Sequence, residues 1–323
     1  MLILVSIVLL AALISAGLIV LLRPLLQRYA LARPNARSSH VTPTPQGAGI
    51  AVIAATLVAA GIGAGIDGLA LSPTLYVATI FTALVGLADD IKPIPVLPRL
   101  ALQAAGVGLL LLAAQPDLRL FPELPLVIER VLLLLGGLWF VNLVNFMDGL
   151  DLMTVAETVP VTVALLLLGW LGELPALPTT IAAALCGAML GFAPFNRPVA
   201  KVFLGDVGSL PIGLLLGWCL LQLAWHHHLV SALLLPLYYL ADATLTLLWR
   251  IATGQPFWVA HRSHFYQCAT DNGLVRDRTF SATEGEPRDT RDVVVEPSTA
   301  LPRPPIADAD TGVGCKPGNR DQR

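Results

Sequence analysis

Long apolar blocks recur along the first 250 residues of this chain. Each is roughly 17 to 25 residues long, the length that an α-helix needs to cross about 30 Å of hydrocarbon. Soluble domains rarely produce such blocks repeatedly, so we expect an all-α integral membrane protein, a polytopic bundle of about nine transmembrane helices. The expected spans are residues 2–22, 48–66, 71–88, 100–115, 128–147, 155–171, 178–195, 208–225 and 229–250.

The composition agrees with a chain whose main solvent is lipid. Hydrophobic residues make up 55% of the 323 residues and charged residues 13%, and the mean hydropathy is +0.73. The net charge of −2 and the absence of a basic face exclude nucleic acid as an expected partner. The first block lacks a small-residue cleavage site before Arg23, which favours an anchor over a removable signal peptide. The four cysteines show no metal or redox spacing and are predicted to be free thiols.

The distribution of Lys and Arg predicts the orientation, because basic residues near helix ends are retained in the cytoplasm. Only Arg119 and Arg130 lie on one side, each with acids nearby. We therefore expect the N-terminus outside the cytoplasm. The cytoplasmic loops and the region after the last span would hold Arg23, Arg28, Arg33, Arg37, Lys92, Arg99, Arg197, Lys201, Arg250 and Arg262.

The character of the chain changes at residue 268. Residues 268–323 are rich in charged residues, Pro, Thr and Gly and contain no apolar run able to pack or to span. The sequence therefore predicts a membrane-embedded domain at 1–267 followed by a disordered cytoplasmic tail at 268–323.

Two adjacent acids, Asp89 and Asp90, end the third apolar block. Carboxylates at a helix C-terminus are disfavoured by the helix dipole and by each other. A divalent cation would compensate them, and Mg²⁺ is usually held by one or two carboxylates together with substrate phosphates. The alternative is a polar stop at the membrane interface, helped by the nearby Lys92.

A polar stripe occupies the end of the fifth block. Asn142, Asn145, Asp148 and Asp151 recur every three residues, which places them on one side of a helix. Gly149 can break that helix and allow a turn beside a ligand. The alternative is a helix C-cap followed by acids that face solvent.

A third acid, Asp206, lies between Gly205 and Gly208 at the start of the eighth span. Glycines permit close approach of the backbone, and the start of a helix offers N–H groups to a phosphate. The alternative is that Asp206 caps its own helix.

Two histidine-containing segments were weighed as sites. His261, Arg262 and His264 follow the last span and can bind phosphate through charge-assisted hydrogen bonds, or anionic lipid head groups as a basic patch. The run 226–228 on the opposite face favours an interfacial turn, since three adjacent histidines cannot all point at one ion.

Taken in order, these motifs resemble a known family. The resemblance covers residues 34–267 and points to the polyprenyl-phosphate N-acetylhexosamine-1-phosphate transferases of glycosyl transferase family 4, which include the MraY and WecA enzymes. The ending 261–267 resembles the branch that initiates bacterial O-antigen and related surface polysaccharides. The motifs are Pro34-Asn35-Ala36-Arg37-Ser38-Ser39-His40, Pro43-Thr44-Pro45, Asp89-Asp90, Asn142 to Asp151, and Val202-Phe203-Leu204-Gly205-Asp206-Val207-Gly208-Ser209.

The sequence departs from the family in two places. Gln46-Gly47-Ala48-Gly49 replaces a more usual Arg-Gly-Gly-Gly. Family members usually have ten or more spans and continue into the membrane where this chain has its polar tail. A truncation or a shifted reading frame at the 3′ end of the gene would produce such a change.

The resemblance implies a reaction at the cytoplasmic face of a bacterial inner (plasma) membrane. Undecaprenyl phosphate, or another polyprenyl phosphate, would attack the β-phosphorus of a UDP-N-acetylhexosamine and release UMP. The implied cofactor is Mg²⁺, with Mn²⁺ as an alternative. The implied partners are these two substrates and the lipid bilayer, with a homodimer as one possible assembly.

The resemblance also implies roles at the matching positions. Asp206 would be the chief metal ligand, Asp89 would deprotonate or orient the lipid phosphate, and Asp90 would support it. All three are therefore candidate catalytic and metal-binding residues. The implied substrate-binding residues are Ser39, His40, Asn142 near the metal, Asn145, Asp148 and Asp151 in the nucleotide pocket, Phe203 on the uracil, and His261, Arg262 and His264 near the diphosphate.

Two other functions stay open at this point. A multi-span transporter would also scatter acids among membrane helices, although transporters tend to place them near the bilayer midplane and to show repeated halves. An inactive truncated relative would keep the motifs without turnover. The sequence does not indicate which N-acetylated sugar is used.

Overall fold

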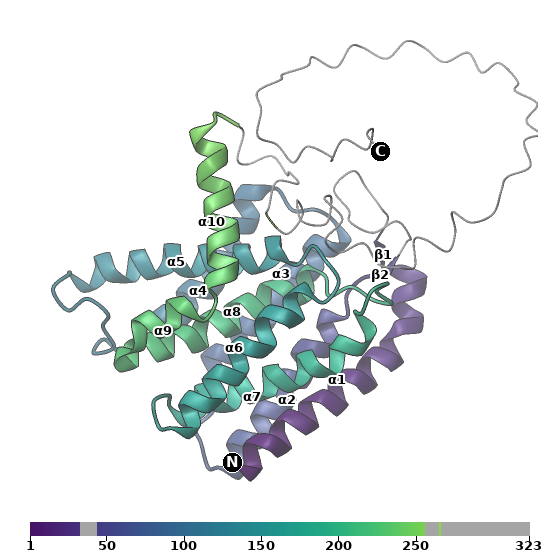
Figure 1. Ribbon diagram of the computed structural model, residues 1–323, viewed down its shortest axis with the longest axis horizontal. Coiled ribbons are helices and arrows are strands. Elements are labelled where there is room, and N and C mark those ends of the chain that lie inside the picture. The colour runs from purple at the N-terminus through teal and green to yellow at the C-terminus, as the bar shows by residue number, and fades with distance from the viewer. Residues whose placement is uncertain (33–43, 256–264, 266–323) are drawn as a thin grey trace, which may run out of the picture. The chain divides into compact units, whose positions relative to one another are not determined.

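The computed structural model describes residues 1–32, 44–255 and 265, and this part is almost entirely helical (Figure 1). It divides into two compact units, Met1–Leu245 and Thr246–Arg323, and the site and packing described below belong to the first. The helices are α1 (Leu2–Tyr29), α2 (Gly49–Ile66), α3 (Pro73–Ile91), α4 (Val96–Ala113), α5 (Leu126–Met147), α6 (Met153–Trp170), α7 (Ala176–Phe192), α8 (Asp206–Leu223), α9 (Leu229–Leu234) and α10 (Leu237–Ala252). Short elements complete it: β1 (Leu31–Ala32) paired antiparallel with β2 (Thr44–Pro45), η1 (Ala193–Phe195) and η2 (Ala224–His228).

The expected helical membrane fold is confirmed. Among the described residues, eight helical stretches are long and apolar enough to cross a membrane; the first six are α1 to α6, and the seventh joins α7 and η1. The eighth, Asp206–Leu234, joins α8, η2 and α9. The first eight predicted spans coincide with these stretches.

The ninth predicted span, 229–250, is divided in two. It comprises α9 and the 16-residue α10, which are separated at Leu235 and Pro236. Proline lacks the backbone N–H that would continue the hydrogen-bond ladder of a helix, which explains the break. The apolar block alone did not indicate this division.

The histidine run forms a turn between α8 and α9. His226 and His227 leave helical geometry, and His227 has a φ of +69°. The imidazole Nε2 of His228 lies 2.8 Å from a carboxylate oxygen of Glu173. The structure thus agrees with the predicted turn.

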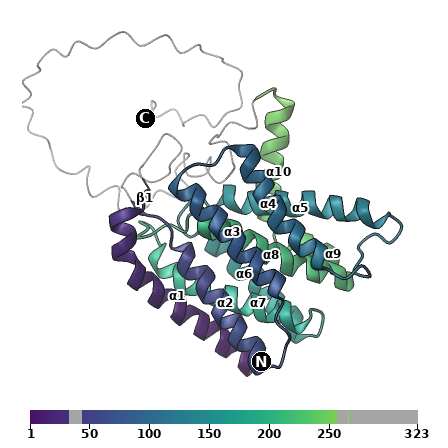
Figure 2. The ribbon, with the colours of Figure 1, turned by 180° about the vertical axis from the view of Figure 1, so that it is seen from behind.

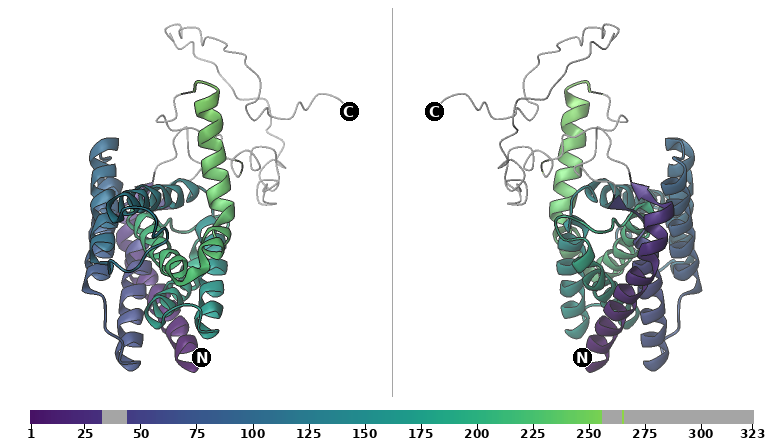
Figure 3. Two further views of the ribbon diagram at one scale, coloured as in Figure 1. Left: turned by 90° about the vertical axis from the view of Figure 1, so that its left-hand side faces the viewer. Right: turned by 90° about the vertical axis from the view of Figure 1, so that its right-hand side faces the viewer.

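Helix α8 is the centre of the bundle. It packs against α2, α3, α5 and α7, while α7 also packs against α1 and α2. Figure 2 shows α1 to α4 from behind, and Figure 3 shows the ribbon from its two sides. Most of the length of α7 and α8 is buried, which explains why their sequences are apolar on every side.

Glycines bring α2 and α3 onto the beginning of α8. A side chain at Gly49 would collide with the backbone of Gly208, and one at Gly86 would collide with the Asp206 carbonyl. Small residues allow helix backbones in a membrane to approach in this way. The close crossing of α3 and α8 brings the end of one helix to the start of the other, where the predicted acids lie.

We predict that Gly86→Ala lowers the melting temperature of the detergent-solubilised protein. The added methyl would force α3 away from α8, and overpacking of this kind costs about 1–3 kcal/mol. Gly65→Ala is the matched control, because a Cβ there meets nothing within 4 Å. Equal melting temperatures for the two variants would show that the crossing is not tightly packed.

Candidate active site

Asp90, near the end of α3, binds the first turn of α8. Its Oδ1 accepts a hydrogen bond from the backbone N–H of Asp206 at 2.9 Å, and its Oδ2 accepts one from Val207 at 3.0 Å. The side-chain amide of Gln46 also donates to Oδ1. A carboxylate at this position satisfies unpaired N–H groups and is favoured by the helix dipole.

Gly205 makes this contact possible. Its φ is +76°, a conformation that side chains disfavour, and a Cβ there would lie 2.7 Å from Oδ2 of Asp90. The glycine before Asp206 therefore serves the close approach of a carboxylate from another helix.

Two interpretations of the start of α8 were wrong. Its N–H groups were expected to be free for a phosphate, or capped by Asp206 itself. The N–H groups of Asp206 and Val207 are instead occupied by Asp90, and Asp206 is the first residue of the helix. The sequence could not reveal this, because the cap comes from 116 residues earlier in the chain.

The Asp206 carboxylate lies between α5 and α3. Its Oδ1 accepts a hydrogen bond from Nδ2 of Asn145 at 2.8 Å, and Asn145 also donates to the Ser209 hydroxyl at 2.8 Å. The carboxyl groups of Asp206 and Asp89 lie close enough to interact directly. Two carboxylates so close repel each other unless a proton or a cation lies with them.

Asp89 is held from the other side by the loop after α3 and by the first turn of α4. Its Oδ1 accepts the backbone N–H of Ile94 at 2.6 Å, and its Oδ2 forms an ion pair of 2.9 Å with Nη1 of Arg99. The positive charge of Arg99 predicted only the orientation of the chain, and this contact was not predicted. A cation ten residues after a paired acid, in the first turn of the next helix, was the available clue.

The polar stripe of α5 is shorter than predicted. The helix ends at Met147, so that only Asn142 and Asn145 share its surface, while Asp148 caps the end and Asp151 lies in the next loop. The amide of Asn142 donates to Gln103 of α4 at 2.7 Å rather than to Asp206. Gly149 follows the helix end directly, in agreement with its predicted effect as a helix breaker.

Asp148 lies beside the carboxylate cluster. Its Oδ1 accepts a hydrogen bond from the Thr154 hydroxyl. Burial, with the negative charge of Asp90 nearby as a further cause, raises the pKa of Asp148 to about 7. This side chain thus changes charge near neutral pH.

Asp151 and Asn196 join the loop after α5 to the loop before α8. Asp151 Oδ2 accepts the backbone N–H of Ala200 at 3.0 Å, and Asn196 Oδ1 accepts that of Leu152 at 2.8 Å. Asn196 was not predicted. It also donates to the Val202 carbonyl at 3.1 Å, so it fixes the segment that leads to Phe203.

Phe203 lies in a partly exposed position beside β2. Its N–H donates to the Pro45 carbonyl at 2.7 Å, and its carbonyl accepts from the N–H groups of Gly47 and Ala48 at 3.1 and 3.0 Å. These bonds join the segment 44–48 to the segment before α8. Gln46, which departs from the family pattern, is thereby positioned on Asp90.

The predicted residues fall into three groups. Asp89, Asp90, Asn145, Asp148 and Asp206 come together, whereas Asn142 and Asp151 make other contacts nearby. Within the described ranges, no group of three His, Cys, Asp or Glu side chains is placed to hold a metal ion. The residues that lie outside the described part of the chain are Ser39, His40, His261, Arg262 and His264.

Comparison with known proteins addresses the origin of this arrangement. Residues 72–224, which contain Asp89, Asp90 and Asp206, match the profile of glycosyl transferase family 4. The chain is similar to proteins named as polyprenyl-phosphate sugar-phosphate transferases. Among these relatives, a decaprenyl-phosphate N-acetylglucosaminephosphotransferase of Mycolicibacterium smegmatis is 33% identical over 210 residues.

The similarity extends to two branches of this family. A phospho-N-acetylmuramoyl-pentapeptide-transferase of Limosilactobacillus fermentum is 37% identical over 114 residues, which cover 35% of this chain and 34% of that protein. The M. smegmatis match covers 58% of this chain and 52% of its relative. The chain thus spans about half the length of the curated relatives it matches. The predicted surface-polysaccharide branch stays a prediction.

We predict that Asp148 makes the protein less stable as the pH rises. Its pKa of about 7 lies above the value of about 3.9 in an unfolded chain, so the folded state binds the proton more tightly. The free energy of unfolding should therefore decrease between about pH 4 and pH 7 and change little outside that window. Melting temperatures at pH 5.5 and 8 should differ less for Asp148→Asn than for the parent. The exposed Asp117→Asn is the control, and equal pH dependence in all three proteins would contradict the assignment.

Proposed function

We propose that the protein transfers an N-acetylhexosamine-1-phosphate group from a UDP-sugar to undecaprenyl phosphate or another polyprenyl phosphate, releasing UMP. The observation that supports this most strongly is the convergence of Asp89, Asp90 and Asp206, from the end of α3 and the start of α8. One phosphoanhydride bond is broken and another is formed. The enzyme must therefore mainly align two anions and offset their repulsion.

The carboxylate cluster fits a divalent cation. Asp89 and Asp206 contact each other through their carboxyl groups, and Mg²⁺ is usually held by one or two carboxylates plus substrate phosphates. We propose Asp206 and Asp89 as the residues that hold Mg²⁺, or alternatively Mn²⁺. Such an ion, when bound, screens the charge on the transferred phosphoryl group.

Asp90 has a different role in this proposal from the other two acids. Its oxygens accept from the N–H groups of Asp206 and Val207, so it positions the start of α8. Asp89 then faces Asp206 and would orient the lipid phosphate, which approaches as a nucleophile. Asn145 fixes the rotamer of Asp206 through its 2.8 Å hydrogen bond.

The nucleotide would lie on the side of the loops after α5 and before α8. Phe203 is partly exposed there and would stack on the uracil, which favours an aromatic face. Asp148 would line the pocket, and Asp151 would stabilise it through Ala200. His261, Arg262, His264, Ser39 and His40 stay candidates for contacts with the phosphates.

The proposed membrane, orientation and pathway follow from the sequence. We propose a bacterial inner membrane location with the carboxylate cluster at the cytoplasmic face and the N-terminus outside, on the basis of the Lys and Arg distribution. The ending at 261–267 supports a role in initiating surface polysaccharide such as O-antigen. Two relatives named for cell-wall precursors keep that pathway as the alternative product.

We predict that Asp206→Asn reduces UMP release by at least about 100-fold, since a preorganised charge that acts on the transition state commonly contributes this much. The assay incubates membranes containing the full chain with undecaprenyl phosphate, Mg²⁺ and a panel of UDP-N-acetylhexosamines. Mass spectrometry of the lipid product identifies the sugar. The backbone N–H of residue 206 still donates to Asp90, so the variant should keep the parent melting temperature.

Asp117→Asn is the matched control, because Asp117 is exposed and distant in sequence from the cluster. Full Mg²⁺-dependent turnover by Asp206→Asn would refute the assignment. No UMP release by the parent protein with any donor would favour a transporter or an inactive relative instead.

A further inference from the structure

A pair of buried side-chain amides joins α4 to α5 beside the carboxylate cluster. Gln103 of α4 is 2% exposed and Asn142 of α5 is 4% exposed, and Nδ2 of Asn142 donates to Oε1 of Gln103 at 2.7 Å. Asn142 precedes Asn145 by three residues, so the two are neighbours on one side of α5. Asn145 in turn donates to the Asp206 carboxylate at 2.8 Å. Gln103 is thus connected to the cluster through α5.

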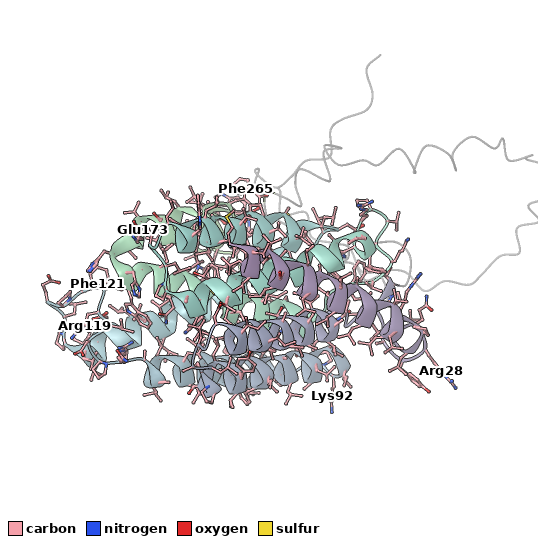
Figure 4. The ribbon with its side chains drawn as sticks, turned by 90° about the horizontal axis from the view of Figure 1, so that it is seen from below. Arg28, Lys92, Arg119, Phe121, Glu173 and Phe265 are labelled. Carbon is pink, nitrogen blue, oxygen red and sulfur yellow. The ribbon has the colours of Figure 1, made fainter. Side chains whose placement is uncertain are left out.

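Gln103 lies towards the end of the bundle that carries the cluster. Figure 4 shows Lys92, directly after α3, at one end of the bundle and Arg119, from the loop between α4 and α5, at the other. Helix α4 runs between these ends, with Gln103 in its second turn and Asn142 opposite it in the second-to-last turn of α5. Polar side chains inside membrane helices are costly, so this pair calls for an explanation.

The hydrogen bonds of Asn142 determine which of its two terminal atoms is left open. Its Nδ2 carries two protons, and it donates to Gln103 and to the Leu138 carbonyl, the latter at 2.8 Å. If this amide were turned over, its oxygen would face the oxygens of Gln103 and Leu138, which would repel it. The two acceptors therefore fix the amide, and within the described residues Oδ1 of Asn142 accepts no hydrogen bond.

The amide pair serves stability poorly. Nε2 of Gln103 is closed to water and has no hydrogen-bond partner in the described part of the chain. An unsatisfied buried donor destabilises a fold, whereas replacing both partners of a buried pair by apolar groups of the same shape is nearly neutral. An apolar side chain cannot, however, supply an acceptor for the Asn142 amide. The oxygen of Gln103 is therefore the part that needs a functional explanation.

The cation site proposed above needs oxygens from outside the acidic cluster. Within the described ranges, no three His, Cys, Asp or Glu side chains are grouped to hold a metal ion. Neutral oxygens, of water or of amides, must therefore complete the shell of an ion held by Asp89 and Asp206. Mg²⁺ usually keeps several of its waters, so an amide oxygen one helical turn from Asn145 can act on the ion through a bound water.

We propose that Gln103 is a positioning residue for this cation site. By accepting from Nδ2 of Asn142, it holds the Asn142 amide so that Oδ1 is directed to the water shell of the ion. Gln103 itself touches neither the ion nor a substrate. This inference rests on the proposed function, because it requires a cation at Asp89 and Asp206.

Mn²⁺ binding by the purified full chain in detergent, followed by electron paramagnetic resonance, tests this role without turnover. Gln103→Met keeps the length of the side chain and removes its amide oxygen. Its affinity for Mn²⁺ should be about tenfold weaker than that of the parent, because partners that orient a metal ligand commonly contribute about 10–100-fold. Gln222→Met, in the last turn of α8 and far along that helix from Asp206, is the matched control and should bind as the parent does.

A double-mutant cycle separates positioning from general packing. Asn142→Leu keeps the branched shape of the side chain and should also weaken Mn²⁺ binding. If Gln103 acts only through Asn142, the double variant should bind Mn²⁺ no more weakly than Asn142→Leu alone. The double variant should also keep the parent melting temperature, because both polar partners are replaced by apolar groups.

The outcomes distinguish this inference from the proposed function. Unchanged Mn²⁺ affinity in Gln103→Met, or additive losses in the double variant, would overturn the positioning role and leave the cation site in place. If the parent binds no Mn²⁺, or if Asp206→Asn binds it as tightly as the parent, the cation site itself is wrong and the positioning role fails with it.

Discussion

The hydrogen bonds from the backbone N–H groups of Asp206 and Val207 to the carboxylate of Asp90 determine how the rest of the candidate site is arranged. They join the end of α3 to the start of α8, two points that are far apart in the chain. Charge-assisted bonds of this kind are about twice as strong as neutral ones. Glycines on both sides make the approach possible, because any side chain at Gly86 or Gly205 would occupy the same space.

This arrangement concentrates negative charge at one place. With Asp90 turned towards backbone N–H groups, Asp89 and Asp206 face each other, and Asp148 lies close enough to feel the charge of Asp90. One ion pair with Arg99 compensates only part of this charge. A site of this kind is costly in the absence of a cation, which is a physical reason to connect it with phosphate chemistry rather than with membrane anchoring.

The sequence was sufficient for most of the fold because its physical signal is simple. An apolar block long enough to span a bilayer must satisfy its own backbone, and a helix is the only local solution. The predicted end of the third block at Asp89 and Asp90 was correct for the same reason. The ninth span was not, since α9 and α10 belong to one largely apolar block and only Leu235 and Pro236 separate them.

The site was harder to predict because it depends on contacts between distant segments. The order of the motifs indicated that Asp89, Asp90 and Asp206 belong to one site. It did not indicate that Asp90 caps α8. The family resemblance implied a place for Asn142 near the metal, whereas the side-chain amide of Asn142 donates to Gln103 of α4. Arg99 and Asn196 carry no motif of their own, and their importance appears only when the loops are folded together.

Helices α5 and α8 carry groups of opposite charge at their two ends. At the end of α5 and the start of α8, Asn145 and Asp206 meet beside Asp89 and Asp90. At the start of α5 and just after α8, the Arg130 guanidinium stacks over the Trp225 ring at 5.4 Å. The two ends of this helix pair are kept apart by the length of the helices, 22 residues for α5 and 18 for α8. The residues between the two ends are apolar. Substitutions there are therefore expected to affect both ends through the packing of α5 on α8 and not through charge.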